Sequence, residues 1–221
     1  MKLNFSFSHL KTLIAGIGLT GSLLASGAVL ADTYEVTLTN ITKGQAFTPR
    51  LGITHTNGQV FTLGAPAIDE VATIAEGGDI GPLMALLESF PMAVTDMAVG
   101  DGLLMPGDTQ SFMIEGNPGD LFTLINMIIP TNDGFVAVNG VELPESGSVQ
   151  YRSVVYDAGS ETNDELCANI PGPVCGGAGG SPEDDGEGYI YIHPGIQGIG
   201  DLEPADYDWR NPAAMVTVRK M

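Results

Sequence analysis

The chain has 221 residues, with 27 Asp and Glu against 8 Lys and Arg, and a formal net charge of −19. This excess of negative charge repels phosphate backbones and anionic membrane surfaces, so it argues against nucleic-acid binding and against unaided binding to anionic membranes. Hydrophobic residues make up 43% of the chain, which excludes an acidic disordered tail and is enough for a buried core. The length suits one domain, or one domain with a processed segment.

Residues 1–31 have the pattern of a secretory signal peptide. Two Lys precede an uncharged run that starts at Thr12 and ends in Val29-Leu30-Ala31, with small residues where signal peptidase requires them. A retained membrane anchor is the alternative, which the Gly-rich run and the cleavage motif disfavour. We therefore expect residues 32–221, with a formal charge of −21 after two Lys are removed from the −19 chain, to be exported to the periplasm or the extracellular space.

The exported part is predicted to consist mostly of β-strands. Short alternating or apolar runs, separated by turn signals, predict strands at 34–39, 51–55, 59–63, 111–115, 121–129, 135–138, 150–156, 189–193 and 213–219. Thr56-Asn57-Gly58 predicts a hairpin and Asn139-Gly140 a turn. Apolar residues at helical spacing over 80–90 predict one short helix. The pattern indicates an all-β domain over 32–221, an antiparallel β-sandwich of about eight strands.

The chain contains two cysteines, Cys167 and Cys175. In an oxidising compartment, two cysteines eight positions apart are expected to form a disulfide. A metal-binding or redox pair is the alternative. The spacing is not that of a metal knuckle, and there is no Cys-x-x-Cys, so we favour the structural bond.

The acidic residues are concentrated in one segment. Residues 157–208 contain twelve Asp and Glu and no Lys or Arg. The run from Glu183 to Glu187 is Gly-flanked and is typical of a solvated surface loop. The other acids follow predicted strands, beside Gly and Asn, where carboxylates and carbonyls can converge on a hard cation.

Two loops offer oxygen ligands of the kind that Ca²⁺ takes. Asp133 follows the apolar strand that ends at Ile129, and Asp157 and Glu161 lie four positions apart across a Gly. A loop with this spacing can curl around one ion, while Asp133 supplies a carboxylate from the neighbouring loop. The spacing is not that of an EF-hand. The structural alternative is that these carboxylates only solvate turns.

These residues also carry a resemblance to a known family. The chain resembles the spondin amino-terminal domain family, in its secreted bacterial branch, over nearly all of residues 34–219. The matching stretches include Ala46-Phe-Thr-Pro-Arg-Leu-Gly-Ile-Thr-His-Thr-Asn57, Met127-Ile-Ile-Pro-Thr-Asn-Asp-Gly-Phe135, Tyr156-Asp-Ala-Gly-Ser-Glu-Thr-Asn-Asp-Glu165, Gly188-Tyr-Ile-Tyr-Ile-His-Pro-Gly-Ile-Gln-Gly198 and Tyr207-Asp-Trp-Arg-Asn-Pro212. The stretches are specific together, although each alone is not.

The resemblance implies an eight-stranded antiparallel sandwich, similar to calcium-binding membrane-docking sandwiches, with Ca²⁺ bound at one end. By position, it assigns the metal ligands to Asp133, Asp157 and Glu161; Glu161 stands where the family often has Asp. Asn132, Asn163 and Glu165 are additional candidates, which either contact the ion or cap the loops. Animal members of the family belong to secreted matrix proteins that mediate cell adhesion, so the resemblance also implies an adhesive role.

The sequence departs from the bacterial branch in one strand. That branch often reads His-Ile-His-x-Gly-Ile-His-Gly, but here Tyr191 and Gln197 replace two of the histidines, which leaves His193. A histidine without such partners is expected to be structural. Trp209 is likewise expected to cover the core, with Arg210 paired to a nearby Asp, rather than to form a recognition patch.

Motifs for catalysis are lacking in the sequence. It contains no Gly-x-Ser-x-Gly, no His-Glu-x-x-His and no phosphate-binding loop. We therefore expect a non-catalytic, calcium-binding module for adhesion or extracellular interaction. Its partner would be an extracellular or cell-surface protein or glycan, and we expect no binding to nucleic acid, and none to anionic membranes in the absence of calcium. The alternatives are a metal-assisted hydrolase of an extracellular polymer and a structural surface component without a ligand.

Overall fold

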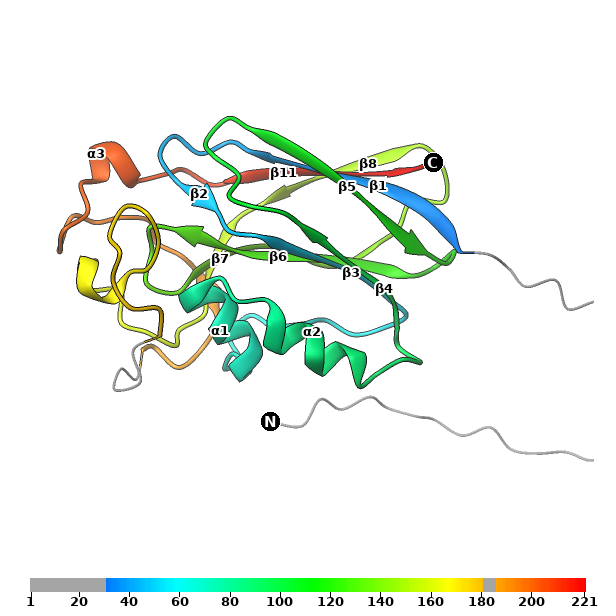
Figure 1. Ribbon diagram of the computed structural model, residues 1–221, viewed down its shortest axis with the longest axis horizontal. Helices are drawn as coiled ribbons and strands as arrows, with labels where there is room; N and C mark the ends of the chain where they lie inside the picture. The colour runs from blue at the N-terminus through cyan, green and yellow to red at the C-terminus, as the bar shows by residue number, and fades with distance from the viewer. Residues whose placement is uncertain (1–30, 181–185) are drawn as a thin grey trace, which may run out of the picture. The chain divides into compact units, whose positions relative to one another are not determined.

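The computed structural model describes residues 31–180 and 186–221, which form one compact unit. Two antiparallel β-sheets pack face to face, and Figure 1 shows them as two layers with helices below the lower one. The first sheet has the strand order β5-β1-β11-β8. Its strands are β1 (Asp32–Asn40), β5 (Thr109–Gly116), β8 (Ser148–Ser153) and β11 (Ala214–Lys220).

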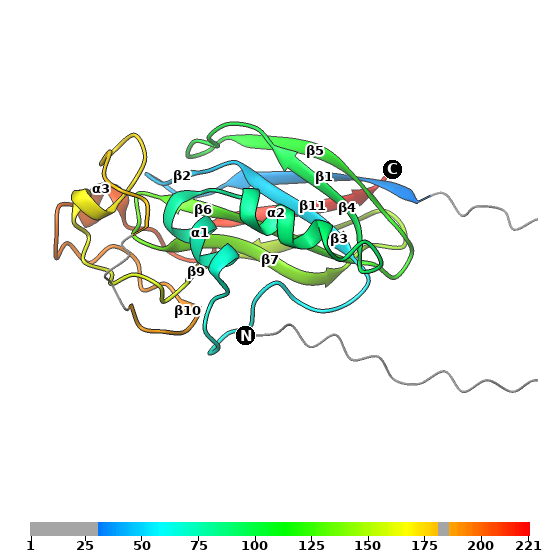
Figure 2. The same cartoon turned by 60° about the horizontal axis from the view of Figure 1, so that its bottom comes forward.

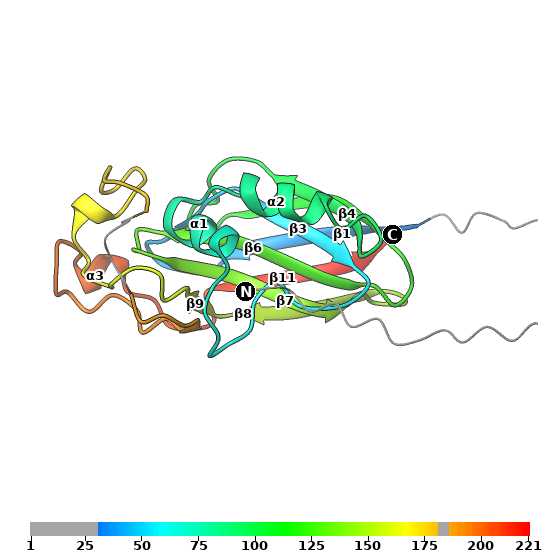
Figure 3. The same cartoon turned by 90° about the horizontal axis from the view of Figure 1, so that it is seen from below.

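The second sheet is larger and has the order β10-β9-β7-β6-β3-β4, with β2 paired to β6. Its strands are β2 (Ala46–Phe47), β3 (Arg50–His55), β4 (Val94–Gly100), β6 (Leu121–Ile129), β7 (Gly134–Glu142), β9 (Val155–Asp157) and β10 (Tyr191–Ile192). Two helices, α1 (Asp69–Gly77) and α2 (Gly81–Glu88), cover the outer face of this sheet, as Figures 2 and 3 show.

The main core lies between the two sheets. β1 alternates buried and half-buried residues, and its buried side chains Tyr34, Val36 and Leu38 face those of Phe122, Leu124 and Val136 in the same apolar cluster. This alternation is typical of a strand with one face on the core. The first sheet therefore leaves its other face to water.

The central strands of the second sheet are buried on both faces, and the sequence of β6 shows why. Along β6, every residue after Leu121 is buried, because Ile125 packs under α1 and α2 while Leu124 packs between the sheets. A strand that is buried on both faces reads as a continuous apolar run. The helices contribute Val71, Ile74 and Leu83 to this second core.

The structure confirms the all-β sandwich and most of the predicted strands. Eight strands have six or more residues, and α2 coincides with the predicted helix. The predicted strand at 59–63 is wrong: it is a loop in which Phe61 packs on Phe135. The predicted turn at Asn139-Gly140 is also wrong, because both residues lie within β7 beside an irregularity in its pairing with β6.

A long segment of little regular structure gathers at one end of the sandwich. It follows β9 and contains a short 3-10 helix, η1 (Cys167–Asn169), and one turn of helix, α3 (Pro204–Tyr207). Figure 1 shows both beside the ends of β6 and β7. The predicted signal peptide (apart from Ala31) and most of the predicted solvated loop lie outside the described residues. No helix in the described part is both long and apolar enough to cross a membrane.

Candidate functional site

The register of the second sheet brings three separate segments together at this end. Asp157, the last residue of β9, pairs with Gly134 of β7 on one side and with Tyr191 of β10 on the other. Asp133 immediately precedes β7, and its carbonyl oxygen accepts a hydrogen bond from the Ala158 nitrogen at 3.1 Å. Asp133 and Asp157 are therefore neighbours, although 24 positions separate them in the chain.

Asp133 has a fully buried side chain that uses only one carboxylate oxygen. Its Oδ2 accepts hydrogen bonds from the Ser160 nitrogen at 2.8 Å, the Ser160 hydroxyl at 3.3 Å and the Glu161 nitrogen at 3.1 Å. Its Oδ1 is buried and has no hydrogen-bond partner in the structure. A buried oxygen without a partner carries a desolvation cost, which makes this atom a candidate ligand for a cation.

Asp157 is also fully buried, and both of its carboxylate oxygens are engaged. Oδ1 accepts a hydrogen bond from the Gly159 nitrogen at 2.8 Å, and Oδ2 accepts one from the Asn163 side-chain amide at 2.6 Å. The Gly159 contact depends on glycine, since its φ is +64° and an added Cβ would lie 2.3 Å from the Tyr189 carbonyl oxygen. The 158–163 loop is thus held around the Asp157 carboxylate.

The two carboxylates repel each other in a place that water does not reach. Burial raises the pKa of Asp133 to about 8; the negative charge of Asp157 also raises it, whereas the hydrogen bonds from the Glu161 and Ser160 nitrogens lower it. Burial likewise raises the pKa of Asp157 to about 6. No Lys or Arg in the described chain pairs with either residue. Negative charge at this site is therefore poorly compensated.

Two side chains from the β10 region complete the surroundings of Asp157. The hydroxyl of Tyr191 accepts a hydrogen bond from the Asn163 amide at 3.1 Å, and burial together with the Asp157 and Glu187 charges raises the pKa of Tyr191. His193 is buried against Trp209, with ring centroids 5.0 Å apart, and burial lowers its pKa to about 4. His193 is therefore neutral at physiological pH and supplies no positive charge.

The tautomer of His193 follows from its contacts. Its Nδ1 accepts a hydrogen bond from the Gly195 nitrogen at 3.0 Å, so in the neutral ring Nε2 carries the proton. Nε2 lies 3.8 Å from the Asp157 Oδ2, which is too long for a hydrogen bond. The buried positions of His193 and Trp209 agree with the structural roles expected for them, and Arg210 pairs with Asp208 at 2.6 Å.

We define the acidic cluster as Asp133, Asp157, Glu161 and Glu187. Glu161 is buried, and its backbone nitrogen donates a hydrogen bond to the Asp133 Oδ2. Glu187 is exposed, and its charge contributes to the raised pKa values of Asp133 and Asp157. The Gly188 nitrogen donates to the Gly159 carbonyl at 2.8 Å, which holds the segment that carries Glu187 over the 158–161 turn.

Other predicted ligands lie in a second group of polar residues, whose oxygens are already engaged. The three carboxylate contacts of Glu165 are with the backbone nitrogens of Gln197 (2.5 Å), Gly198 (2.7 Å) and Ile199 (2.9 Å). Asn132 accepts from the Glu165 nitrogen at 3.2 Å and donates to Asp164 at 3.0 Å. We call Asn132, Asp164 and Glu165 the capping group, because their side chains hold loops together.

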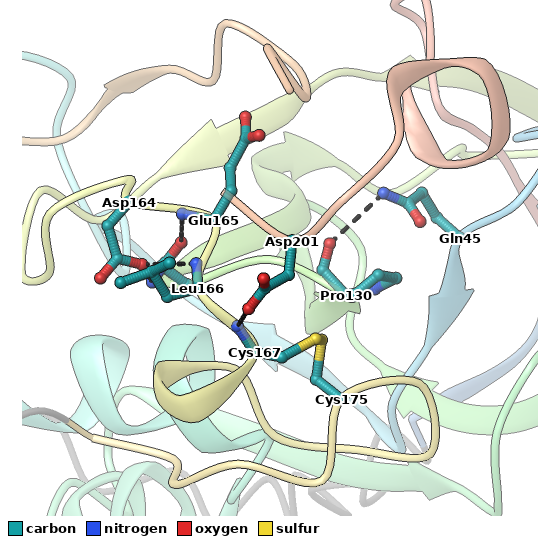
Figure 4. Close-up of a disulfide and its surroundings, with 9 residues drawn as sticks. Gln45, Pro130, Asp164, Glu165, Leu166, Cys167, Cys175 and Asp201 are labelled. Carbon is teal, nitrogen blue, oxygen red and sulfur yellow. Dashed lines mark hydrogen bonds between the residues drawn. A yellow bond between two sulfur atoms is a disulfide. The ribbon is translucent and has the colours of Figure 1, made fainter. Parts of the chain in front are cut away.

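Cys167 and Cys175 form the predicted disulfide beside the capping group. Figure 4 shows the bond together with Asp164 and Glu165, and it shows the Asp201 carboxylate accepting from the Cys167 nitrogen at 2.9 Å. The disulfide is consistent with an oxidising compartment. It closes the loop that carries η1 and so fixes the chain that follows the acidic cluster.

The donor set of the acidic cluster fits a hard divalent cation. Its groups are carboxylate oxygens with neighbouring amide and hydroxyl oxygens, the buried Oδ1 of Asp133 has no partner, and positive charge is lacking. Within residues 31–180 and 186–221, no three His, Cys, Asp or Glu side chains are already arranged as a ligand set. The carboxylates would have to draw together around an ion.

No protein-family model matches the chain, and no curated protein matches it in sequence. The resemblance to the spondin amino-terminal domain family therefore rests on the quoted stretches alone.

Of the three principal residues of the sequence hypothesis, the structure makes Asp133 and Asp157 neighbours and places the Glu161 backbone against Asp133, but their three side chains are not arranged as a ligand set. Asp133 contacts the 160–161 backbone, and Asn163 contacts Asp157. It places Asn132 and Glu165 in the capping group instead. Sequence reasoning did not place Tyr191 or Glu187 near the acids. The pairing of β10 with β9 puts Tyr191 opposite Asp157, and no local pattern in the sequence reveals that register.

Proposed function

We propose that this chain is an exported calcium-binding β-sandwich of spondin type, which serves adhesion or another extracellular interaction without catalysis. The observation that carries the proposal is the pair Asp133 and Asp157. Both carboxylates are fully buried, burial raises the pKa of each, the Asp157 charge raises that of Asp133 further, and no basic side chain of the described chain offsets them. A divalent cation would supply the missing positive charge.

Asp133, Asp157 and Glu161 would hold the ion, and Ca²⁺ prefers such oxygen ligands. When bound, it would neutralise carboxylates that otherwise repel. Because the Asp133 carboxylate already binds the backbone of residues 160 and 161, its position is linked to that of the whole turn. The chain's own contribution is to anchor the turn through Asp133 and Gly159. The ordered end of the sandwich would then present a surface to an extracellular or cell-surface protein or glycan.

The proposal is tested by thermal unfolding of the protein without its predicted signal peptide, first in EDTA and then with excess Ca²⁺. An ion that binds only the folded state at about 100 times its dissociation constant stabilises it by about 2.7 kcal/mol. For a domain of this size, that raises Tm by roughly 5–10 °C. An unchanged Tm would contradict the calcium site.

Two Asp→Asn variants make the test specific. Asp133→Asn preserves shape but removes a proposed ligand, and we expect it to abolish the Ca²⁺-dependent rise in Tm. Asp206→Asn is the matched control, because Asp206 is an exposed acid on α3 with only a backbone hydrogen bond to Glu203. An equal Ca²⁺ response in wild type and Asp133→Asn would show that the ion binds elsewhere.

A further inference from the structure

A groove on another part of the sandwich has the features of a ligand site. It has a volume of about 490 Å³ and lies between the second half of β7, the end of β8 and the 59–63 loop. Sites for small ligands have volumes of roughly 300–1,000 Å³. β7 and β9 are paired in the second sheet, and Figure 3 shows β8 of the first sheet near the same edge. None of the acidic-cluster residues lines the groove.

The groove exists because β9 is short. β9 pairs with β7 only along Gly134–Val136, so the rest of β7 has no strand beside it on that side. β8 belongs to the other sheet and crosses near this edge, where the Ser153 hydroxyl donates to the Ala137 carbonyl at 2.7 Å and the Tyr151 hydroxyl donates to the Glu142 carbonyl at 3.0 Å. A peptide strand added along this edge would compete with both bonds, which disfavours a peptide as the ligand.

The groove combines aromatic surfaces with hydrogen-bonding groups. Phe61 and Tyr156 pack edge to face, with centroids 4.9 Å apart, and Tyr151 forms another part of the lining. Gln59 is exposed on the rim, and Asn139 is held by bonds to the Val60 nitrogen and the Phe61 carbonyl. Aromatic side chains offer apolar faces and, in tyrosine, a polar tip, which together suit a ring that carries hydroxyl groups.

Arg152 is the one charged residue among the described residues that line the groove. In the described residues, five of the six Lys and Arg side chains have partners: Lys43 with Ala205, Arg50 with Asp101 and Gly102, Arg210 with Asp208, Arg219 with Glu35, and Lys220 with Asp32. Arg152 is exposed in the lining of the groove, and its side chain has no hydrogen bond or ion pair within the described residues. In so acidic a protein, a guanidinium left without a carboxylate is available to a ligand's carboxylate.

We propose that this groove binds a uronate unit of an acidic polysaccharide, with the sugar carboxylate on Arg152 and the ring against the half-buried Tyr151 and Tyr156. The net negative charge weakens binding of a long polyanion but acts less on a single unit, because charges beyond about 8 Å are largely screened at physiological ionic strength. The charge of Glu142 does reach the lining, since it raises the pKa of Tyr151, so Arg152 must outweigh it. The inference goes beyond the proposed function, since it names a ligand class and a surface separate from the acidic cluster. It does not require a bound metal.

The test measures binding of an oligogalacturonate by calorimetry, both in EDTA and with Ca²⁺. The same oligomer with its carboxylates methyl-esterified is the matched ligand, because it differs mainly in charge. We expect the acid form to bind in at least one buffer, and at least about ten-fold more tightly than the ester. Equal binding of acid and ester, no binding of the acid, or tighter binding of an acidic peptide such as hexaglutamate would overturn the proposal.

Three variants locate the site. Arg152→Gln should weaken binding about ten-fold or more, and Arg152→Lys should weaken it less, because charge remains but bidentate geometry is lost. Arg219→Gln is the control, since it removes the same charge from β11 of the same sheet but outside the groove. Equal losses for Arg152→Gln and Arg219→Gln would contradict the assignment. If the protein binds the oligomer but its Tm does not change with Ca²⁺, the uronate site in the groove is supported and the calcium site is contradicted.

Discussion

Two groups of acids lie at the same end of the sandwich, and they differ in how fully their carboxylate oxygens are hydrogen-bonded. In the capping group, the Glu165 carboxylate accepts three backbone hydrogen bonds, and Asp164 accepts from Asn132, Leu166 and Asn169. In the acidic cluster, Asp133 leaves one buried oxygen without a partner beside the buried Asp157. A carboxylate that is saturated by backbone donors is structural, whereas a buried pair without positive charge calls for a cation.

The largest effect should come from the capping group. Glu165→Ala removes the acceptor of three backbone N–H groups at 197–199, and we expect it to lower the free energy of unfolding by about 3 kcal/mol. Glu165 also has a φ of +56°, a left-handed conformation that its contacts help to hold. Chemical denaturation measures the loss. The Ca²⁺ response should persist in this variant, and its disappearance would contradict the separation of the two groups.

The disulfide beside the capping group should have the next largest effect. The double variant Cys167→Ser and Cys175→Ser opens a loop with a sequence separation of 8, which should cost about 2–3 kcal/mol of unfolding free energy. Denaturation of the wild type under reducing conditions provides an independent measure. Equal stability of the oxidised and reduced protein would show that the capping group holds the loop without the covalent bond.

The contribution of Asp133 to the free energy of unfolding should fall as pH rises. An acid that is paired with a basic group in the folded protein shows the opposite dependence. The pKa of Asp133 is raised from 3.8 to about 8 in the folded protein, so the folded state retains a proton that the unfolded state releases. The contribution of Asp133 to stability is therefore complete below about pH 4 and is lost as pH rises through about 8. In EDTA at pH 8, Asp133→Asn should be more stable than wild type by about 1 kcal/mol or more.

The difference in unfolding free energy between wild type and Asp133→Asn isolates the titration of Asp133, because all other acids are the same in both proteins. Denaturation of wild type and Asp133→Asn in EDTA, from pH 4 to pH 8, should show a gap that opens as pH rises. Excess Ca²⁺ should reverse it, because only the wild type has the ligand. A constant gap across this range would indicate that Asp133 is already ionised at low pH.

The smallest effect should come from an acid that does have a basic partner. Arg210 pairs with Asp208 at 2.6 Å, but the arginine side chain is 87% exposed. Surface pairs of this kind contribute little, so Arg210→Ala should change the free energy of unfolding by about 0.5 kcal/mol or less. High salt should reduce the difference further. A loss above about 1 kcal/mol would show that Arg210 has a structural role beyond this pair.

Much of the fold could be predicted from the chain, where a strand has its own pattern. The alternation in β1 and the apolar run of β6 are local properties, and both led to correct strands. The 59–63 run has the same alternation, but it forms a loop. Its buried residue, Phe61, packs on Phe135 and Tyr156 without strand pairing of its own. Helix α1 was missed, since its apolar residues Val71, Ile74 and Ala75 form only one short stripe.

The candidate site was predictable to the level of residue type and loop. Asp133 and Asp157 follow predicted strands, and that position indicated that their carboxylates could converge from neighbouring loops. The sequence could not separate the capping group from the acidic cluster. Asn132 is adjacent to Asp133, yet its partners are Asp164 and Glu165. Whether an acid has all its carboxylate oxygens hydrogen-bonded depends on distant backbone groups. The donors to Glu165, for example, are the nitrogens of residues 197–199.

By itself, therefore, the sequence determined the class of fold, the disulfide and the loops that carry the acids, because alternation, cysteine spacing and turn residues act over short distances. Only the tertiary structure decided the environment of each acid. It paired β9 with β7 and β10, buried Asp133 beside Asp157, and supplied three N–H donors to Glu165. It also left Arg152 without a partner over a groove. Charge in a protein is set by burial and by neighbours, and the fold brings those neighbours from distant parts of the chain.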